Sequence, residues 1–246
     1  YAAEEYPSAE IVSVRSEGDI HRTNYLDISK RMAQLAHSLI SIGIKPGDRI
    51  ATLAWNGYRH LELYYAISGI GAVCHTINPR LSSDQLTYII NHAEDLLLFV
   101  DLTFVPILEA VKDRLPLEMK IIILTDKKHM PKTSLKTMCY EELLKDKPQK
   151  INWPDFNEDT AASLCYTSGT TGEPKGTLYS HRSTVLHAMM LAISLPNALK
   201  EGKKILPVVP LFHVNAWGLP YAAPLTGAGL VFPGPKLDGD SLFNLI

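Results

Sequence analysis

The chain has 246 residues and a formal net charge of −2, with 46% hydrophobic and 20% charged residues. This composition supports a sizeable core and excludes collagen-like, coiled-coil and disordered proteins. Since the near-neutral charge lacks the basic excess of a dedicated nucleic-acid-binding domain, we expect no nucleic-acid partner.

Helices and apolar strands alternate along the first part of the chain. Apolar residues recur at helical spacing from Ile28 to Ile42, and Gly43 stands where a glycine would end that helix. Ser82, followed by Gln85, has the form of a capping box. The expected helices are 28–42, 58–71, 82–92 and 104–115, and the expected strands are 49–55, 72–77, 96–100 and 120–124. This alternation predicts an α/β fold with a largely parallel sheet flanked by helices.

Two later segments carry weaker patterns. The polar segment from Asp126 to Asp155 is interpreted as a solvated loop with one short helix around 141–145. The segment from Ile205 to Pro235 has no Asp, Glu, Lys or Arg, but six prolines interrupt it. A membrane-spanning helix needs about 20 consecutive apolar residues, and an interior proline breaks a helix. We therefore expect several short buried elements there and no transmembrane segment.

The cysteines and the N-terminal residues bear on the compartment. Cys74, Cys139 and Cys165 lie far apart and form no C-x-x-C pair, so we expect buried free thiols in a reducing compartment. The first ten residues are acidic where a signal peptide is basic. A cytoplasmic protein is expected, with a location at the membrane periphery left open.

An apolar strand expected at 161–166 runs directly into a loop of unusual composition. Thr167 to Gly176 contains four hydroxyl side chains, three glycines and one lysine, and a second strand is expected at 177–180. Glycines let backbone N–H groups point inward, hydroxyls donate hydrogen bonds, and a lysine attracts phosphate oxygens. The loop differs from the P-loop motif, because Glu173 and Pro174 separate Gly172 from the lysine. A polyphosphate site is indicated, and a Gly/Thr-rich surface hairpin is the alternative.

The order of residues in this loop resembles a known family. Tyr166 to Gly176, with Ser180 and His181 beyond, resembles the phosphate-binding signature of the adenylate-forming superfamily. That superfamily contains acyl- and aryl-CoA synthetases, firefly luciferase and peptide-synthetase adenylation domains. Pro210 to Trp217 resembles its next core motif in the form found in medium- and long-chain fatty acyl-CoA synthetases. The resemblance implies part of the large N-terminal domain of an adenylate-forming enzyme.

The resemblance also implies a reaction and its site residues. A fatty acid attacks the α-phosphate of ATP with Mg²⁺, and coenzyme A then displaces AMP to give acyl-CoA. The catalytic residues implied are Lys175 and His213, and Trp217 would gate the acyl chain. Thr167 is the implied Mg²⁺ ligand, and Val214 would lie near the nucleotide. The residues implied in nucleotide binding are Thr167, Ser168, Gly169, Thr170, Thr171, Gly172, Lys175 and Val214.

Structural alternatives are open for the second motif. Trp217 could fill the core, as most tryptophans do, and His213 could be a hydrogen-bonded core histidine. Small residues at 218, 222, 223, 227 and 228 could line an acyl tunnel or could simply allow tight packing. Met189 and Met190, in the helix expected after His181, are expected to fill the core.

The resemblance gives expectations about organisation and about competing functions. Residues 1–160 would form the first α/β portion of the large domain. Residues 161–246 would hold the phosphate loop, the gate motif and the start of the adjoining subdomain. The C-terminal catalytic domain would be absent and the fragment inactive alone, and a homodimer is left open. The alternatives are adenylation of an aryl, short-chain or amino acid, and a non-catalytic nucleotide-binding or dimerisation module.

Overall fold

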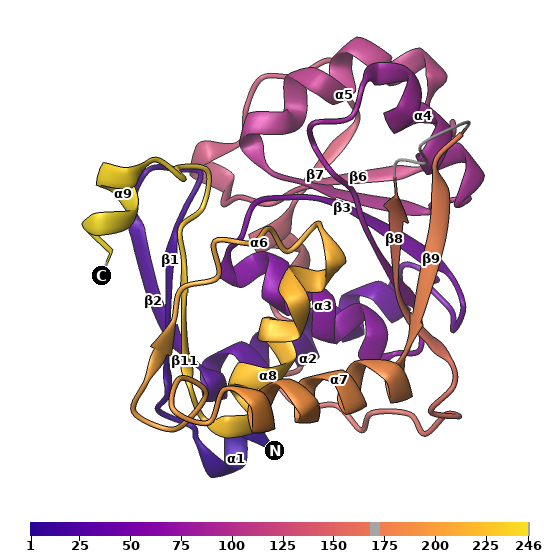
Figure 1. Cartoon of the computed structure of the whole chain (residues 1–246). Helices are drawn as coiled ribbons and strands as arrows, with labels where there is room; N and C mark the ends of the chain where they lie inside the picture. The colour runs from indigo at the N-terminus through magenta and orange to yellow at the C-terminus, as the bar shows by residue number, and fades with distance from the viewer. Residues whose placement is uncertain (168–172, 246) are drawn as a thin grey trace.

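The computed structural model describes residues 1–167 and 173–245 and contains two β-sheets with helices packed between and around them (Figure 1). The larger sheet has the order β7-β6-β5-β3-β4-β8-β9. All neighbouring pairs in it are parallel except β8 and β9, which form an antiparallel hairpin. Its strands are β3 (Arg49–Leu53), β4 (Val73–Thr76), β5 (Leu97–Val100), β6 (Lys120–Ile123), β7 (Thr137–Cys139), β8 (Ala161–Thr167) and β9 (Lys175–Ser180).

The strands of this sheet are apolar throughout because both faces are covered. On β3, Ile50 packs into one core cluster, whereas Ala51 and Leu53 pack into another on the opposite face. The first cluster includes side chains of α2 (Tyr25–Ser41) and α3 (Tyr58–Gly69). The second includes side chains of α4 (Ser83–His92) and α5 (Val105–Val111). The expected largely parallel α/β sheet flanked by helices is confirmed.

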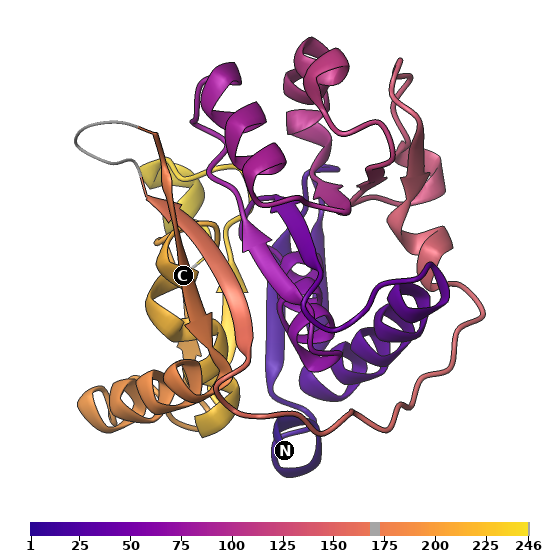
Figure 2. The same ribbon diagram turned by 90° about the vertical axis from the view of Figure 1, so that its right-hand side faces the viewer.

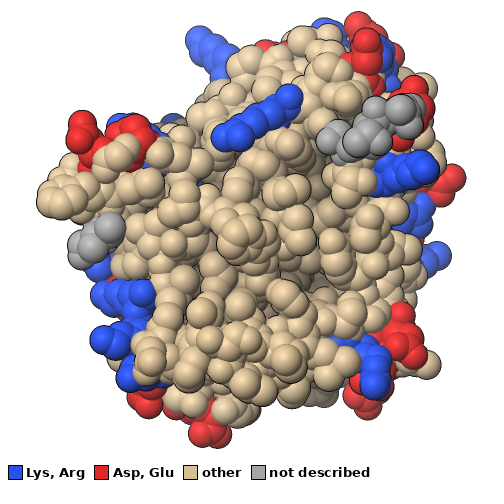
Figure 3. Space-filling model, in the orientation of Figure 1, with Lys and Arg blue, Asp and Glu red and all other residues tan. Residues whose placement is uncertain are grey.

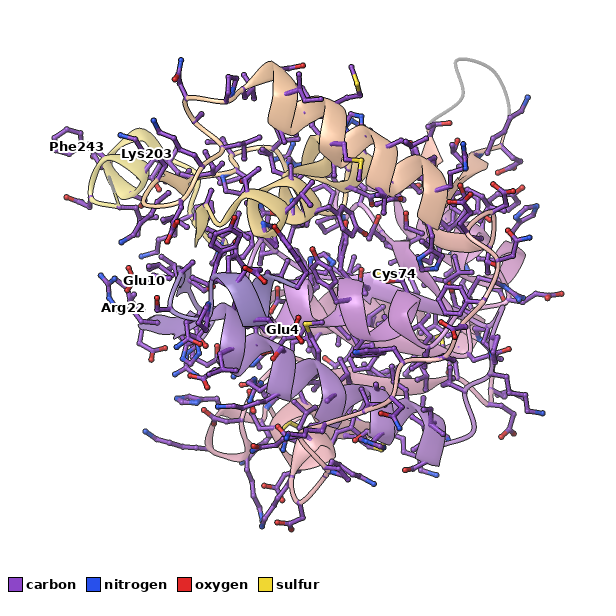
Figure 4. All side chains as sticks on the ribbon, turned by 90° about the horizontal axis from the view of Figure 1, so that it is seen from below. Glu4, Glu10, Arg22, Cys74, Lys203 and Phe243 are labelled. Atoms are coloured by element: carbon purple, nitrogen blue, oxygen red, sulfur yellow. The ribbon has the colours of Figure 1, made fainter. Side chains whose placement is uncertain are left out.

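A smaller sheet joins distant parts of the chain. Its order is β10-β11-β1-β2, with β1 parallel to β11 and antiparallel to β2. Glu10 and Arg22 form an ion pair across β1 and β2 at the margin of this sheet, with an N–O distance of 2.7 Å (Figure 4). Its strands are β1 (Glu10–Val14), β2 (Ile20–Asn24), β10 (Lys204–Ile205) and β11 (Gly229–Phe232).

The remaining helices lie around these sheets. Helix α8 contacts α7, and both contribute side chains to the core cluster of α2 and α3. The bounds are α1 (Ala2–Glu5), α6 (Tyr140–Leu144), α7 (His181–Ser194), α8 (Leu219–Thr226) and α9 (Gly239–Phe243), with short 3₁₀ turns at Leu102–Phe104, Lys112–Arg114 and Lys127–His129 and a left-handed turn at Val214–Gly218. Among the described residues, no helix is long and apolar enough to cross a membrane.

Local signals placed most helix ends correctly. Ser82 and Gln85 form the expected capping box at the start of α4. Gly43 follows α2 with a φ of +98°, a conformation that glycine adopts without strain. The three cysteines are buried free thiols as predicted, and Cys74 lies among the densely packed side chains of Figure 4.

Two expectations about local structure were wrong. The segment from Asp126 to Asp155 contains the edge strand β7 besides the expected short helix. Sequence patterning missed β7 because three residues carry too little alternation, and pairing with β6 forms the strand. Met189 and Met190 lie in α7 but are exposed rather than in the core, and Ala188 is the buried residue of that helix.

Candidate functional site

The hairpin of β8 and β9 carries the first motif (Figure 2). Thr167 ends β8 and pairs with Lys175, which begins β9, and both residues are exposed. The hydroxyl of Thr167 donates a hydrogen bond of 3.4 Å to the backbone oxygen of Lys175. At Gly176, a Cβ would lie 3.0 Å from Leu164 Cδ1, so a glycine lets the two strands approach. The paired ends of the strands hold the lysine and the threonine at one end of the hairpin.

The central part of the first motif lies outside the described residues. This applies to the predicted phosphate-binding residues Ser168, Gly169, Thr170, Thr171 and Gly172. These residues connect β8 to β9 in the sequence. A β-hairpin is expected both for a phosphate-binding loop and for a surface turn, so the hairpin does not distinguish the two interpretations.

A buried pair joins His75, on the strand next to β8, to Asp95, and sequence analysis did not single it out. The Nδ1 atom of His75 lies 2.7 Å from Asp95 Oδ2, and both side chains are fully buried. The ring of His75 packs against that of Tyr166, whose hydroxyl lies 2.6 Å from Nδ1 of His92. Burial raises the pKa of Asp95, while the neighbouring His75 opposes this effect. These contacts hold Tyr166, the first residue of the first motif.

The second motif contains a left-handed turn. Five consecutive residues, from Val214 to Gly218, have φ values between 47° and 77°. The left-handed conformation costs about 1–2 kcal/mol for each non-glycine residue, and most for a β-branched one. Gly218 is required for a second reason, because a Cβ there would lie 2.5 Å from the ring of His187. Strain of this kind is maintained only where surrounding contacts determine the conformation.

The turn presents the predicted second-motif residues on the surface. His213 is exposed, and Val214 and Trp217 are 38% and 61% exposed. Trp217 and His213 therefore do not fill the core of the described structure. On this face, charged side chains lie mainly at the margin and the middle is largely uncharged (Figure 3).

Asn56 holds the segment that leads into the turn. Its Nδ2 atom donates to the backbone oxygens of Pro207 and Val209, and its Oδ1 accepts from the backbone N–H of Leu211 at 2.6 Å. These bonds satisfy the backbone of a proline-interrupted segment that has little secondary structure of its own. The uncharged run thus folds as short pieces, as expected, held in part by Asn56 in the loop after β3.

The small residues near the second motif are packed tightly. Ala222, Ala223 and Ala228 are fully buried in the core. A Cβ at Gly227 would lie 2.6 Å from the ring of Tyr6. These contacts support the tight-packing alternative over the acyl tunnel at these positions. A separate apolar cavity of about 450 Å³ lies next to α8, and its lining includes Tyr25, Met32, Leu61, Tyr65, Val185 and Tyr221.

The donors fit the Mg²⁺ expected from the resemblance only in part. Thr167 offers one exposed hydroxyl oxygen at the end of β8. Mg²⁺ at nucleotide sites takes one or two protein ligands and completes its shell with phosphate oxygens and water. Elsewhere, Glu17, Asp126 and His129 lie within 4.8 Å of one another. A guanidinium nitrogen of Arg15 lies 4.0 Å from Glu17 and 3.9 Å from Asp126, which disfavours a cation there.

The two motifs are neighbours in space. The Nδ2 atom of Asn215, in the left-handed turn, donates 2.9 Å to Ser163 Oγ on β8, the strand that ends at Thr167. The hydroxyl of Thr76 reaches the backbone oxygen of Phe212 at 3.5 Å.

A family profile described as AMP-binding enzyme matches residues 1–246. The chain belongs to the AMP-binding enzyme family.

Relatives in this family are similar along the whole chain. A medium-chain-fatty-acid–CoA ligase of Ectopseudomonas oleovorans is 49% identical, over 100% of this chain and 45% of that protein. A 3-methylmercaptopropionyl-CoA ligase of Ruegeria lacuscaerulensis is 48% identical, over 100% and 46%. A long-chain-fatty-acid–CoA ligase of Thermus thermophilus is 44% identical, over 99% and 44%. The chain spans less than half the length of these relatives.

Solved structures share the fold. An anthranilate CoA ligase in complex with anthranoyl-AMP matches with a TM-score of 0.80 at 20% identity, over 94% of this chain and 43% of that one. A Mycobacterium tuberculosis fatty acyl CoA synthetase matches with a TM-score of 0.79 at 22% identity, over 100% and 45%. At these identities the likeness shows the fold, which is that of the N-terminal part of adenylate-forming enzymes.

Proposed function

We propose that the full-length protein is an AMP-forming acyl-CoA synthetase that activates fatty acids. The observation that carries the proposal is the 49% identity, along the entire chain, to a medium-chain-fatty-acid–CoA ligase. The hairpin that holds Thr167 and Lys175 supports it, since β8 also contacts Asn215 of the second motif through Ser163. ATP, coenzyme A and a fatty acid would be the substrates.

In the proposed reaction, a carboxylate oxygen of the acid attacks the α-phosphate of ATP, and the bond to pyrophosphate breaks. The thiol of coenzyme A then attacks the acyl carbon, and AMP leaves. Lys175 would neutralise charge on the departing phosphates, together with the residues of the loop. Mg²⁺, bound in part through Thr167, would add positive charge at the same phosphates. His213 would lie near the acyl carboxylate and Val214 near the nucleotide, so that two mutually repelling anions are aligned.

Trp217 would act as the gate for the acyl chain. A large, exposed aromatic side chain on a left-handed turn supports this role, because it lies at the surface and not in a packed core. We propose that the adenine, ribose and coenzyme A contacts lie mostly beyond Ile246. The same proposal divides the chain at residue 160 and assigns a separate C-terminal catalytic domain to the full-length protein. A cytoplasmic location fits three buried free thiols, and a homodimer stays a proposal.

A substrate panel tests the proposed function. The panel contains acetate, octanoate, palmitate, benzoate and 3-methylmercaptopropionate. The full-length protein should convert at least one of these acids to its CoA thioester, with release of AMP and pyrophosphate. We expect octanoate to be preferred. The 48% identity to a 3-methylmercaptopropionyl-CoA ligase favours that short thioether acid as the second candidate. Failure with every acid would support a non-catalytic nucleotide-binding module instead.

Replacement of Lys175 tests the role of the loop. We expect Lys175→Ala to lower ATP–pyrophosphate exchange by at least tenfold, which corresponds to about 1.4 kcal/mol of lost transition-state stabilisation, with fatty-acid binding unchanged. Lys145→Ala, at an exposed lysine after α6, is the control and should behave as the wild type. Unchanged exchange in Lys175→Ala would remove the lysine from the mechanism.

A further inference from the structure

Asn215 is the buried polar residue of the left-handed turn. Its side chain points into the protein, and the residue is 7% exposed, whereas the neighbouring Val214 and Trp217 are exposed. Asparagine tolerates the left-handed conformation, but valine, alanine and tryptophan do not favour it. Three of the four non-glycine residues of the turn thus disfavour its left-handed backbone conformation. Contacts outside the turn must therefore maintain that conformation.

The amide of Asn215 supplies contacts of this kind. Its Nδ2 atom donates to Ser163 Oγ at 2.9 Å, and its Oδ1 lies 3.2 Å from the hydroxyl of Tyr64, which shares its one proton with the backbone oxygen of Leu211. The Sγ atom of Cys165 lies 3.7 Å from the same Oδ1. All these side chains are buried, so water does not replace a lost partner. Two of the partners lie on β8 and one on α3, so a single side chain joins the turn to two elements of the larger sheet layer.

The direction of β8 gives these bonds a further consequence. Ser163 and Cys165 precede Thr167 on the strand that enters the first motif, and the Cys165 thiol also contacts Thr76 Oγ1 at 3.2 Å. Thr76 in turn reaches the backbone oxygen of Phe212, just before the turn. The turn and the base of the phosphate-loop hairpin therefore share one buried hydrogen-bonded group.

We propose that Asn215 is a positioning residue that locks the left-handed turn to β8 and so fixes Trp217 relative to the phosphate-loop hairpin. It touches no substrate and acts through Trp217 and Val214. The expected effect of Asn215 on catalysis rests on the proposed function. The structural link between the turn and β8 does not.

Fluorine NMR of the full-length protein labelled with fluorotryptophan tests the link, with the Trp217 resonance assigned from Trp217→Phe. We expect Asn215→Ala and Ser163→Ala each to shift or broaden that resonance, and the double variant to add nothing further. Ser38→Ala is the matched control, because it removes a buried hydroxyl that donates 2.6 Å to the backbone oxygen of Leu143, in another part of the core. It should leave the Trp217 resonance unchanged.

The kinetic arm separates this proposal from the proposed function. If fatty acids are substrates, losing one or two net hydrogen bonds should lower kcat/KM for the acid about fivefold to thirtyfold in Asn215→Ala, with ATP affinity unchanged. If the wild type activates no acid but the resonance responds as expected, the function fails and the positioning role stands. A Trp217 resonance that is unchanged in both variants overturns the positioning role. Should Asn215→Ala not fold, Ser163→Ala gives the same test without a substitution inside the turn.

Discussion

At the scale of single residues, exposure separates the side chains proposed for function from those that hold the backbone around them. Lys175, His213 and Trp217 face solvent, whereas Asn56, Asn215 and their partners are buried. An exposed side chain contributes little to stability, and its replacement can therefore be interpreted as an effect on chemistry.

Trp217 gives the first residue-scale prediction. Because its side chain is 61% exposed, Trp217→Ala should change the free energy of unfolding by less than about 0.5 kcal/mol. The same variant should impair acyl-adenylate formation from fatty acids, if the side chain gates the acyl chain. Urea unfolding and pyrophosphate release measure the two effects. A large loss of stability with wild-type kinetics would return Trp217 to a packing role.

Asp101 gives a pH-dependent prediction. Burial raises its pKa from an ordinary value of 3.8 to about 6, although the backbone N–H of Trp55 donates to it and opposes the change. Between these two values the folded protein holds a proton that the unfolded chain has lost. The free energy of unfolding should therefore fall as the pH rises through this window. Asp101→Asn should lack this decrease. Urea unfolding of both proteins across this pH range measures it, and an equal pH dependence of the free energy of unfolding in the two proteins would contradict the prediction.

At the scale of elements, partly buried ion pairs join α2 to α3 and α6. Arg31 on α2 contacts Glu62 on α3 at 2.6 Å and Glu141 on α6 at 2.9 Å. The hydroxyl of Tyr140 also donates to Glu62 at 2.6 Å, and Arg59 contacts Glu141 at 2.9 Å. The segment that sequence patterning treated as a solvated loop is thus fixed to the helical layer through one short helix.

Replacement of Arg31 tests how much these ion pairs contribute to the free energy of unfolding. The Glu62 side chain is fully buried; burial raises its pKa and Arg31 lowers it. Without Arg31 the carboxylate would lose its cation, so Arg31→Ala should destabilise the protein by about 3–5 kcal/mol at neutral pH. The loss should shrink in acid, where Glu62 is protonated, and urea unfolding at two pH values measures both.

The same helix provides the control for Arg31. Lys30 forms an exposed pair with Asp27 at 2.9 Å, and Lys30→Ala should cost less than about 1 kcal/mol. Equal losses in the two variants would show that burial of Glu62 does not decide the energetics.

At the scale of the whole molecule, α7 carries an apolar face that the described residues leave open. Val185, Leu186, Met189, Met190 and Ile193 are each at least 45% exposed. A contiguous apolar surface of this kind promotes association, whereas isolated exposed hydrophobic residues do not.

Charge substitutions on this face should therefore reduce self-association of the 246-residue chain. We expect Met190→Lys with Ile193→Glu to lower the associated fraction in sedimentation velocity and to leave the free energy of unfolding nearly unchanged. Leu117→Lys is the matched control, because Leu117 is exposed but lies away from α7 in sequence. An equal effect of the control would mean that overall polarity, not the α7 face, governs association.

The sequence by itself determined the α/β class, most helix and strand positions and the family. These features follow from local periodicity, capping residues and two long motifs. All three signals are formed by residues that are close together in the sequence. It did not predict β7, the exposure of Met189 and Met190, or the roles of Asn56, Asn215 and the His75–Asp95 pair. Each of these depends on partners far away in the chain: β7 exists through pairing with β6, and Asn215 is held by β8 and α3. Only the tertiary structure brought the second motif against the strand of the first, because long-range hydrogen bonds to buried groups leave no periodic signal in the sequence.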